Sequence, residues 1–302
     1  MRIFVFGSLN MDKVYKVKEF VRAGETINSL SYQEFPGGKG LNQTIAAVRA
    51  GGDVLHIGAI GRDGKLLEDV LLQEGVPLTH LHRLPCATGH AVIQVNAQGQ
   101  NAIIVDPGAN AVIQEEWVDE ALLSAQPGDL ILLQNEINNI PYIIRRARES
   151  GLSVAFNPSP ITDAINSYPL SLVTHFILNE VEGKELTGET EDAAILEGLA
   201  QRFPNAEIML TLGSRGAMYS GKCGRAEFGT YSVEAVDTTA VGDTFCGYYF
   251  SCISRAMDAH KAMLYATGAS AISVTREGAS TSIPRFEEVN AFIAAQGDIR
   301  KY

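Results

Sequence analysis

Residues 236–247, Val-Asp-Thr-Thr-Ala-Val-Gly-Asp-Thr-Phe-Cys-Gly, contain the groups that transfer of a phosphoryl group to a hydroxyl requires. Asp243 follows a glycine and opens an apolar stretch, 243–257, that predicts a buried helix. The start of a helix carries unpaired N–H groups and the positive end of the macrodipole, so the turn 240–243 can hold an anion beside a carboxylate. An ordinary N-cap aspartate is the alternative interpretation, and this segment alone does not decide between them.

A second glycine-rich motif lies near the other end of the chain. Residues 36–44 are Pro-Gly-Gly-Lys-Gly-Leu-Asn-Gln-Thr, and an apolar helix, 45–50, follows them. The glycines allow the backbone to approach a ligand closely. Lys39 and Asn42 lie near the helix start, where they can turn inward as hydrogen-bonding groups. For a glycine cluster on its own, a flexible loop before a helix is the alternative.

The elements that must position these motifs alternate along the chain. We expect strands at 2–6, 54–60, 130–133, 153–156, 176–178 and 208–211, and helices at 41–50, 66–74 and 140–149. Such alternation indicates an α/β protein with a parallel sheet covered by helices on both faces. Two regions, 12–35 and 89–105, instead alternate as strands without helices, with a hairpin turn at 96–99. We find no linker, internal repeat or low-complexity tract.

Composition excludes several classes of protein. The chain has 302 residues, of which 46% are hydrophobic and 20% charged, as is ordinary for a soluble globular protein. A net charge of -11 argues against a nucleic-acid surface. No apolar run reaches the roughly 18 residues of a membrane span, and residues 1–7 predict a strand and turn without a signal-peptide pattern. The four cysteines form no Cys-x-x-Cys pair, so we expect reduced thiols and a cytoplasmic protein.

Competing catalytic motifs are weak. Residues 216–223 nearly match a P-loop, but Cys223 stands where the Ser or Thr that binds Mg²⁺ should be. A strand-like stretch follows in place of the helix that a P-loop needs, so we expect a hairpin. The chain has no dinucleotide fingerprint, no His-Glu-x-x-His and no Gly-x-Ser-x-Gly, and its six histidines are scattered.

Taken together and in order, the two glycine-containing motifs resemble the two signatures of the ribokinase-like (PfkB) sugar kinase family. The first matches throughout, with Gly51 and Gly61 at the expected offsets, whereas the second departs at Val241, where the family usually has a small residue. The resemblance covers almost the whole chain, because shorter matching segments occur at 7–12, 108–111, 134–136, 157–160, 179–182, 211–216 and 274–279.

The resemblance implies an ATP-dependent kinase that phosphorylates a primary hydroxyl of a small sugar, with D-ribose expected first. It implies a single domain over 1–302 with a Rossmann-like parallel sheet, and a β lid, formed by about 12–35 and 89–112, through which two copies dimerise. The alternatives are a related kinase acting on fructose, 2-keto-3-deoxygluconate or a nucleoside, and a catalytically silent sugar- or nucleotide-binding protein on the same fold. Retention of Asp243, Lys39 and Glu182 favours an enzyme.

The same resemblance implies roles for individual residues. Asp243 is the base, and the N–H groups of Ala240, Val241 and Gly242 stabilise charge on the transferring phosphate. The other positions that match sugar-binding residues are Asn10, Asp12, Gly38, Lys39, Asn42 and Glu136. The positions that match nucleotide-binding residues, in addition to Gly242, are Asn179, Glu182, Thr211, Gly213, Ser214, Gly216 and Thr267.

Two kinds of metal ion are implied. Asn179 and Glu182 match a motif that positions Mg²⁺ and phosphate oxygens through water. A monovalent cation, expected to be K⁺, has ligands that match Asp237, Thr239, Ser273, Arg276, Gly278 and Ser282, several through backbone carbonyls. The alternative for Asp237 is that it only closes a turn. Thr267 replaces an Asn that the family places near the adenine, which leaves the contacts to the base open.

Overall fold

The centre of the protein is a ten-stranded sheet whose parallel strands are buried on both faces. The computed structural model describes residues 1–301, and the strand order is β14-β13-β12-β11-β10-β9-β8-β1-β4-β5. Alternate residues of β1 (Ile3–Phe6) pack into hydrophobic cores on opposite faces of the sheet. Ile3 and Val5 belong to one core, and Phe4 and Phe6 belong to the other. Strands that are apolar at every position fit a parallel sheet between two helical layers.

The strand order reverses direction beside β1. On one side lie β4 (Val54–Ile60) and β5 (Leu81–Arg83), and on the other β8 (Leu130–Gln134), β9 (Ser153–Asn157), β10 (His175–Asn179) and β11 (Glu207–Thr211). The antiparallel edge consists of β12 (Ala217–Gly221), β13 (Gly224–Phe228) and β14 (Arg300–Lys301). The P-loop-like segment is therefore a hairpin, as expected. In sheets of this kind, ligands bind outside the carboxyl ends of the strands where the order reverses.

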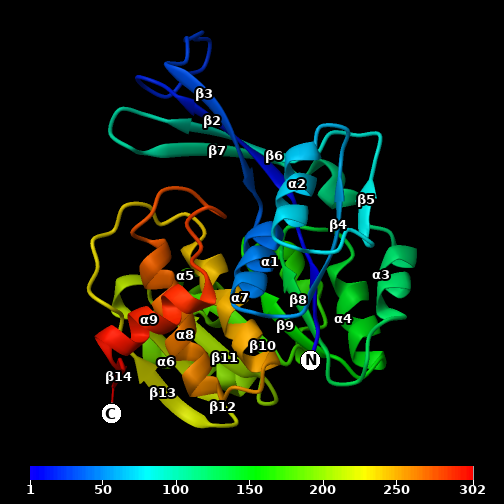
Figure 1. The fold of residues 1–302 in the computed structure, drawn as a ribbon, viewed down its shortest axis with the longest axis vertical. Helices are drawn as coiled ribbons and strands as arrows, with labels where there is room; N and C mark the ends of the chain where they lie inside the picture. Colours follow the sequence, from blue (N-terminus) through cyan, green and yellow to red (C-terminus); the bar gives the residue numbers. More distant parts are fainter. Residues whose placement is uncertain (302) are drawn as a thin grey trace.

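Helices cover both faces of the large sheet (Figure 1). One layer contains α1 (Lys39–Arg49), α2 (Lys65–Gln73), α7 (Val241–Ser254), α8 (Ala259–Ser273) and α9 (Phe286–Gln296). The other contains α3 (Glu115–Leu122), α4 (Ile140–Glu149), α5 (Glu180–Thr187) and α6 (Asp192–Arg202). Short 3₁₀ helices are η1 (Gly108–Val112), η2 (Asp163–Ser167), η3 (Leu170–Leu172) and η4 (Gly213–Arg215). The predicted α/β fold is thus confirmed. Over residues 1–301, no helix is both long and apolar enough to cross a membrane.

A separate four-stranded sheet, which we call the lid, projects at the top of Figure 1. Its strands, in spatial order, are β3 (Ser31–Gly37), β2 (Asn10–Lys16), β6 (Gly89–Val95) and β7 (Asn101–Asp106). They occupy both regions that were expected to form strands without helices. Residues 108–112, at the end of the expected lid segment, instead form η1 beneath it.

Helices α1 and α7 cross in backbone contact at Gly247. A Cβ atom at this position would lie 2.4 Å from the Cβ of Ala46 and 2.6 Å from the carbonyl oxygen of Gln43. Only a glycine fits there without moving one of the helices. Because α1 carries the first motif and α7 the second, this crossing joins segments about 200 residues apart in the sequence.

We expect Gly247→Ala to destabilise the fold by about 1–3 kcal/mol, because the new methyl group overfills the contact between α1 and α7. Thermal or urea unfolding measures this loss. Gly198→Ala, the same change within α6, is the matched control: its Cβ would meet side-chain atoms, of Thr187 at 3.2 Å and of Glu189 at 3.9 Å. We expect that control to stay within about 1 kcal/mol of the wild type. Equal losses in the two variants would contradict the role given to the helix crossing.

Candidate active site

Helix α7 begins at an open turn. Its N-cap is Ala240, which has a left-handed conformation (φ 57), and Val241 is the first helical residue. The expected helix start at Asp243 is therefore wrong by two residues, and so is the interpretation of Asp243 as an N-cap. A Cβ at Gly242 would meet no atom within 4 Å. The first-turn N–H groups, which have no intrahelical partners, thus adjoin a cavity of about 240 Å³ lined by Ala240, Gly242 and Asp243.

The Asp243 carboxylate is buried and held by two amides of α1. Its Oδ2 accepts a hydrogen bond from Asn42 Nδ2 at 3.1 Å, and its Oδ1 accepts one from Gln43 Nε2 at 2.9 Å. Gln43 belongs to the first motif but was not predicted to have a role. Neighbouring residues of a helix do not face the same way, so helix periodicity gave no signal that both amides would reach one carboxylate.

Glu136 and Lys39 form a second, partly buried contact near the Asp243 carboxylate. Glu136 Oε2 accepts the backbone N–H of Lys39 at 3.1 Å and the hydroxyl of Ser8, a residue not predicted for the site. Burial raises the pKa of Glu136, although the Lys39 ammonium opposes this rise. Burial also acts to lower the pKa of Lys39, but the carboxylates of Asp243 and Glu136 outweigh it and raise that pKa. Lys39 is therefore a charged cation within the site.

Asp12 and Asn10 enter from β2, where the lid joins the large sheet. Gly37 on β3 pairs with Asn10, and a Cβ at Gly37 would lie 2.1 Å from Asp12 Oδ2, so a larger residue there would displace this carboxylate. Gly38 has a φ of 94 that favours glycine, and its Cβ would lie 2.9 Å from Asn10 N. Asn110, which was not assigned a role, donates to Asn10 Oδ1 at 2.7 Å. Burial, reinforced by neighbouring carboxylates, raises the pKa of Asp12 to about 7.

A larger cavity, of about 580 Å³, adjoins the first one. Asn179, Thr211 and Gly242 line both cavities. Of the positions predicted to bind nucleotide, those that line the larger cavity are Asn179, Thr211, Gly213, Ser214, Gly216, Gly242 and Thr267. Glu182 lines the smaller one. Apolar residues that the sequence did not single out complete the larger wall, namely Tyr231, Val233, Ala235, Phe245, Ala271 and Val274.

Comparison with known proteins agrees with this geometry. The model of the pfkB family carbohydrate kinases matches residues 1–285. The chain belongs to the PfkB family. It is 35% identical to a ribokinase of Haemophilus influenzae over 298 residues, which cover 96% of this chain and 97% of that one. A ribokinase structure from Thermotoga maritima superposes with a TM-score of 0.85 at 36% identity, covering 97% and 99% of the two chains. An Arabidopsis thaliana ribokinase complexed with ribose and ATP gives 0.84 at 26% identity, covering 96% and 98%.

Membership in the PfkB family makes this protein an ATP-dependent carbohydrate kinase, as the two motifs predicted.

The residues predicted to position a divalent metal, Asn179 and Glu182, bind each other's backbone. Asn179 and Glu182 form a capping box at the start of α5, in which each side chain accepts the backbone N–H of the other residue. Within residues 1–301, no group of three or more His, Cys, Asp and Glu is arranged to hold a metal. One buried carboxylate fits Mg²⁺ that keeps its water and binds substrate phosphates.

The residues predicted to bind a monovalent cation make several separate contacts, some with one another and some with other residues. Asp237 Oδ1 accepts the backbone N–H and the hydroxyl of Thr239, and its Oδ2 accepts the N–H of Gly278 at 2.9 Å. Asp237 therefore does close a turn, and it also joins this turn to the loop 278–283. Ser273 and Ser282 contact each other through their hydroxyls at 2.7 Å. The Arg276 guanidinium instead pairs with Glu288 on α9.

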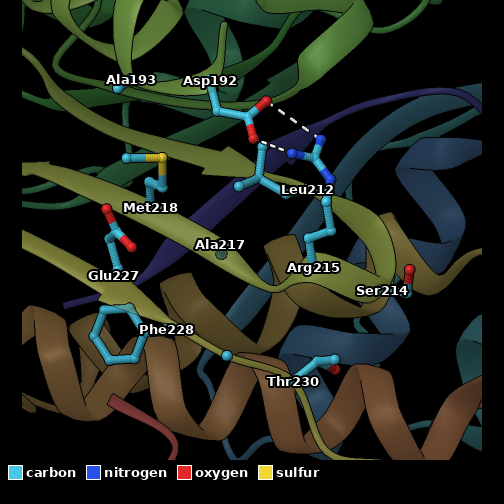
Figure 2. Close-up of a pocket in the computed structure, with 11 residues that line it drawn as sticks. Asp192, Ala193, Leu212, Ser214, Arg215, Ala217, Met218, Glu227, Phe228 and Thr230 are labelled. Atoms are coloured by element: carbon cyan, nitrogen blue, oxygen red, sulfur yellow. Dashed lines mark hydrogen bonds and ion pairs between the residues drawn. The ribbon is translucent and has the colours of Figure 1, made fainter. Parts of the chain in front are cut away.

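The segment η4 lies between the larger cavity and an outer cavity of about 600 Å³ (Figure 2). Ser214 and Thr230 line both cavities. Figure 2 shows the Arg215 side chain directed toward Asp192, with which it forms an ion pair, at the start of α6. Arg215 therefore holds η4 from the side of the outer cavity. Gly213 and Gly216, which lie before and after it, line the larger cavity.

Asp12→Asn should stabilise the protein at pH 8 by on the order of 2 kcal/mol. The pKa of Asp12 in the folded protein, about 7, lies above its ordinary value of 3.8. Ionising this carboxyl therefore costs more in the folded protein than in the unfolded chain, and the wild type loses stability as the pH rises from the lower value to the higher one. Asn remains neutral, so the advantage of the variant should disappear at pH 4. Thermal unfolding at the two pH values measures the difference. A melting temperature at pH 8 equal to that of the wild type would contradict the raised pKa.

Proposed function

We propose that this kinase transfers the γ-phosphoryl group of ATP to a primary hydroxyl of D-ribose, forming ribose 5-phosphate. The observation that carries the proposal is the Asp243 carboxylate, held by Asn42 and Gln43 at the first turn of α7, where the two cavities meet. Relatives named ribokinase support ribose as the first substrate to test.

In the proposed reaction, a sugar hydroxyl oxygen attacks the γ-phosphorus while its proton passes to Asp243. The bond between the γ-phosphorus and the bridging oxygen breaks, and ADP leaves with the bond's electron pair. The first-turn N–H groups of α7 and the Lys39 ammonium stabilise the negative charge that develops on the phosphoryl oxygens. Asp243 serves chiefly to orient the hydroxyl and to accept its proton.

The sugar is proposed to bind between the lid and the carboxyl ends of the strands. Asn10, Asp12 and Glu136 offer oxygen acceptors there, and Lys39 and Asn42 offer donors, which suits a ligand with several hydroxyls. Measuring ADP release with ribose, deoxyribose, fructose, 2-keto-3-deoxygluconate and nucleosides tests this assignment. ADP release with another member of this panel but not with ribose would replace the substrate and keep the chemistry. No release with any of them would favour a silent binding protein.

Mg²⁺ on the ATP phosphates would supply charge neutralisation, and Glu182 is proposed to hold its water shell. A monovalent cation, proposed to be K⁺, would lie beside Asp237. This carboxylate accepts three hydrogen bonds, which leaves room for one further partner. The cation's proposed ligands are the predicted oxygens, with Arg276 contributing only its backbone carbonyl.

The lid is proposed to form a homodimer contact. Its strand β7 exposes large apolar side chains to solvent, including Ile104 and Val105, whose exposed fractions are 68% and 59%. The protein is proposed to work in the cytoplasm, because its four cysteines, at 86, 223, 246 and 252, are all free thiols.

We expect Asp243→Asn to lower kcat by on the order of 10²-fold or more, because it removes the proton acceptor. The fold should survive, since Asn42 Oδ1 is buried without a hydrogen-bond partner and can accept from the new amide after Asn42 flips. Steady-state kinetics and a melting curve measure the two effects. Near-normal turnover by the folded variant would remove Asp243 from the role of base.

Replacing K⁺ by Na⁺ at constant ionic strength should lower kcat severalfold, because a smaller ion fits fixed oxygens poorly and leaves the turn before α7 less ordered. Asp237→Ala should remove this difference between the two salts together with most of the rate. Turnover in both salts measures the effect, and the melting temperature in each gives a second readout. Identical values in the two salts would leave Asp237 with its turn-closing role alone.

A further inference from the structure

Arg49, the last residue of α1, connects three segments through its guanidinium. Its Nη2 and Nε bind the two carboxylate oxygens of Glu74, at the end of α2, at 2.5 and 3.2 Å. Its Nη1 donates to the carbonyl oxygens of Ser280 at 3.0 Å and Ile283 at 2.5 Å. The side chain lies outside both cavities of the site and is only 15% exposed.

The pair with Glu74 keeps this guanidinium in one orientation. Burial acts to raise the pKa of Glu74, but Arg49 and Arg285 outweigh it and hold that pKa below its ordinary value. Glu74 is therefore ionised, and the two parallel bonds fix the plane of the guanidinium. A lysine would keep the charge but could not reach the carboxylate and two carbonyls in this planar arrangement.

The loop that Arg49 holds, 278–283, is bonded on its other side to the segment before α7. Gly278 N donates to Asp237 Oδ2 at 2.9 Å, which fixes the turn three residues before Ala240. The Ser282 hydroxyl contacts that of Ser273 at 2.7 Å, and Thr244, which follows Asp243 in the sequence, donates to Ser273 Oγ at 3.4 Å. Displacing this loop would thus displace the turn that opens toward the cavity.

The same helix also orients the base. Asn42 and Gln43 lie two turns before Arg49 on α1 and bind Asp243, whereas Arg49 fixes the loop that supports the turn 237–240. We propose that Arg49 is a positioning residue for phosphoryl transfer, which holds the loop 278–283 on α1 and so keeps the base and the anion-binding turn in register. This inference rests on the proposed function of that turn.

Arg49→Lys tests the proposal against Glu74→Gln. The lysine variant loses the two carbonyl contacts, so its kcat should fall about tenfold or more while the KM for the sugar changes less than twofold. Hydrogen exchange of the amides at 236–242 should become faster. Glu74→Gln removes the charge of the carboxylate but keeps an amide oxygen that can accept from the guanidinium, and the two carbonyl contacts still hold Nη1. It should therefore lower the melting temperature without changing kcat more than twofold or the exchange at 236–242.

Tyr248→Phe provides a milder variant should Arg49→Lys fail to fold. It removes only the hydrogen bond from the Tyr248 hydroxyl to Pro284 O, 2.7 Å long, which anchors the residue directly after the loop 278–283 without a charge. Exchange at 236–242 should again become faster, with a smaller fall in kcat. Unchanged exchange there, or equal losses of kcat in the Arg49 and Glu74 variants, would overturn the proposal. A wild-type protein that phosphorylates no sugar would instead overturn the proposed function.

Discussion

The contact between the backbones of α1 and α7 is the constraint on which the rest of the site depends. Gly247 brings α7 so close to Ala46 that no side chain fits between them. At this separation, the short amide side chains of Asn42 and Gln43 span the gap and bind both oxygens of Asp243. A wider crossing would leave this carboxylate buried without donors, which is costly in a protein interior. The packing of α1 against α7 therefore also sets the orientation of the Asp243 carboxylate.

The site gathers more negative charge than it neutralises internally. Lys39 lies among the carboxylates of Asp243, Glu136 and Glu182, which keep it protonated despite its burial. The pKa of Asp12 is raised for different reasons, namely burial and the like charges of Glu136 and Asp243. Such an arrangement opposes folding, and it is typical of sites whose charges are completed by substrates and ions.

Much of the fold could be predicted from the sequence because its signals are local. Apolar strands such as 54–60 and helices such as 140–149 were placed at their observed bounds. The hairpin at 216–223 was predicted from Cys223 and from the strand-like stretch that follows it. The start of α7 was placed two residues late. Asp243 has a side chain suited to capping, but the contact with α1 draws it away, and Ala240 takes the capping position in a left-handed conformation. Local propensity could not anticipate this tertiary contact.

By itself, the sequence determined which segments carry the chemistry, since glycines, Lys39 and Asp243 occur in two ordered motifs. Only the tertiary structure decided which side chains meet. Ser8, Gln43 and Asn110 bind Glu136, Asp243 and Asn10 across separations of about 100 to 200 residues. No local pattern encodes such contacts, because they depend on how helices and strands pack at the carboxyl edge of the sheet. Residue types are read along the chain, whereas hydrogen-bond partners are fixed by packing in three dimensions.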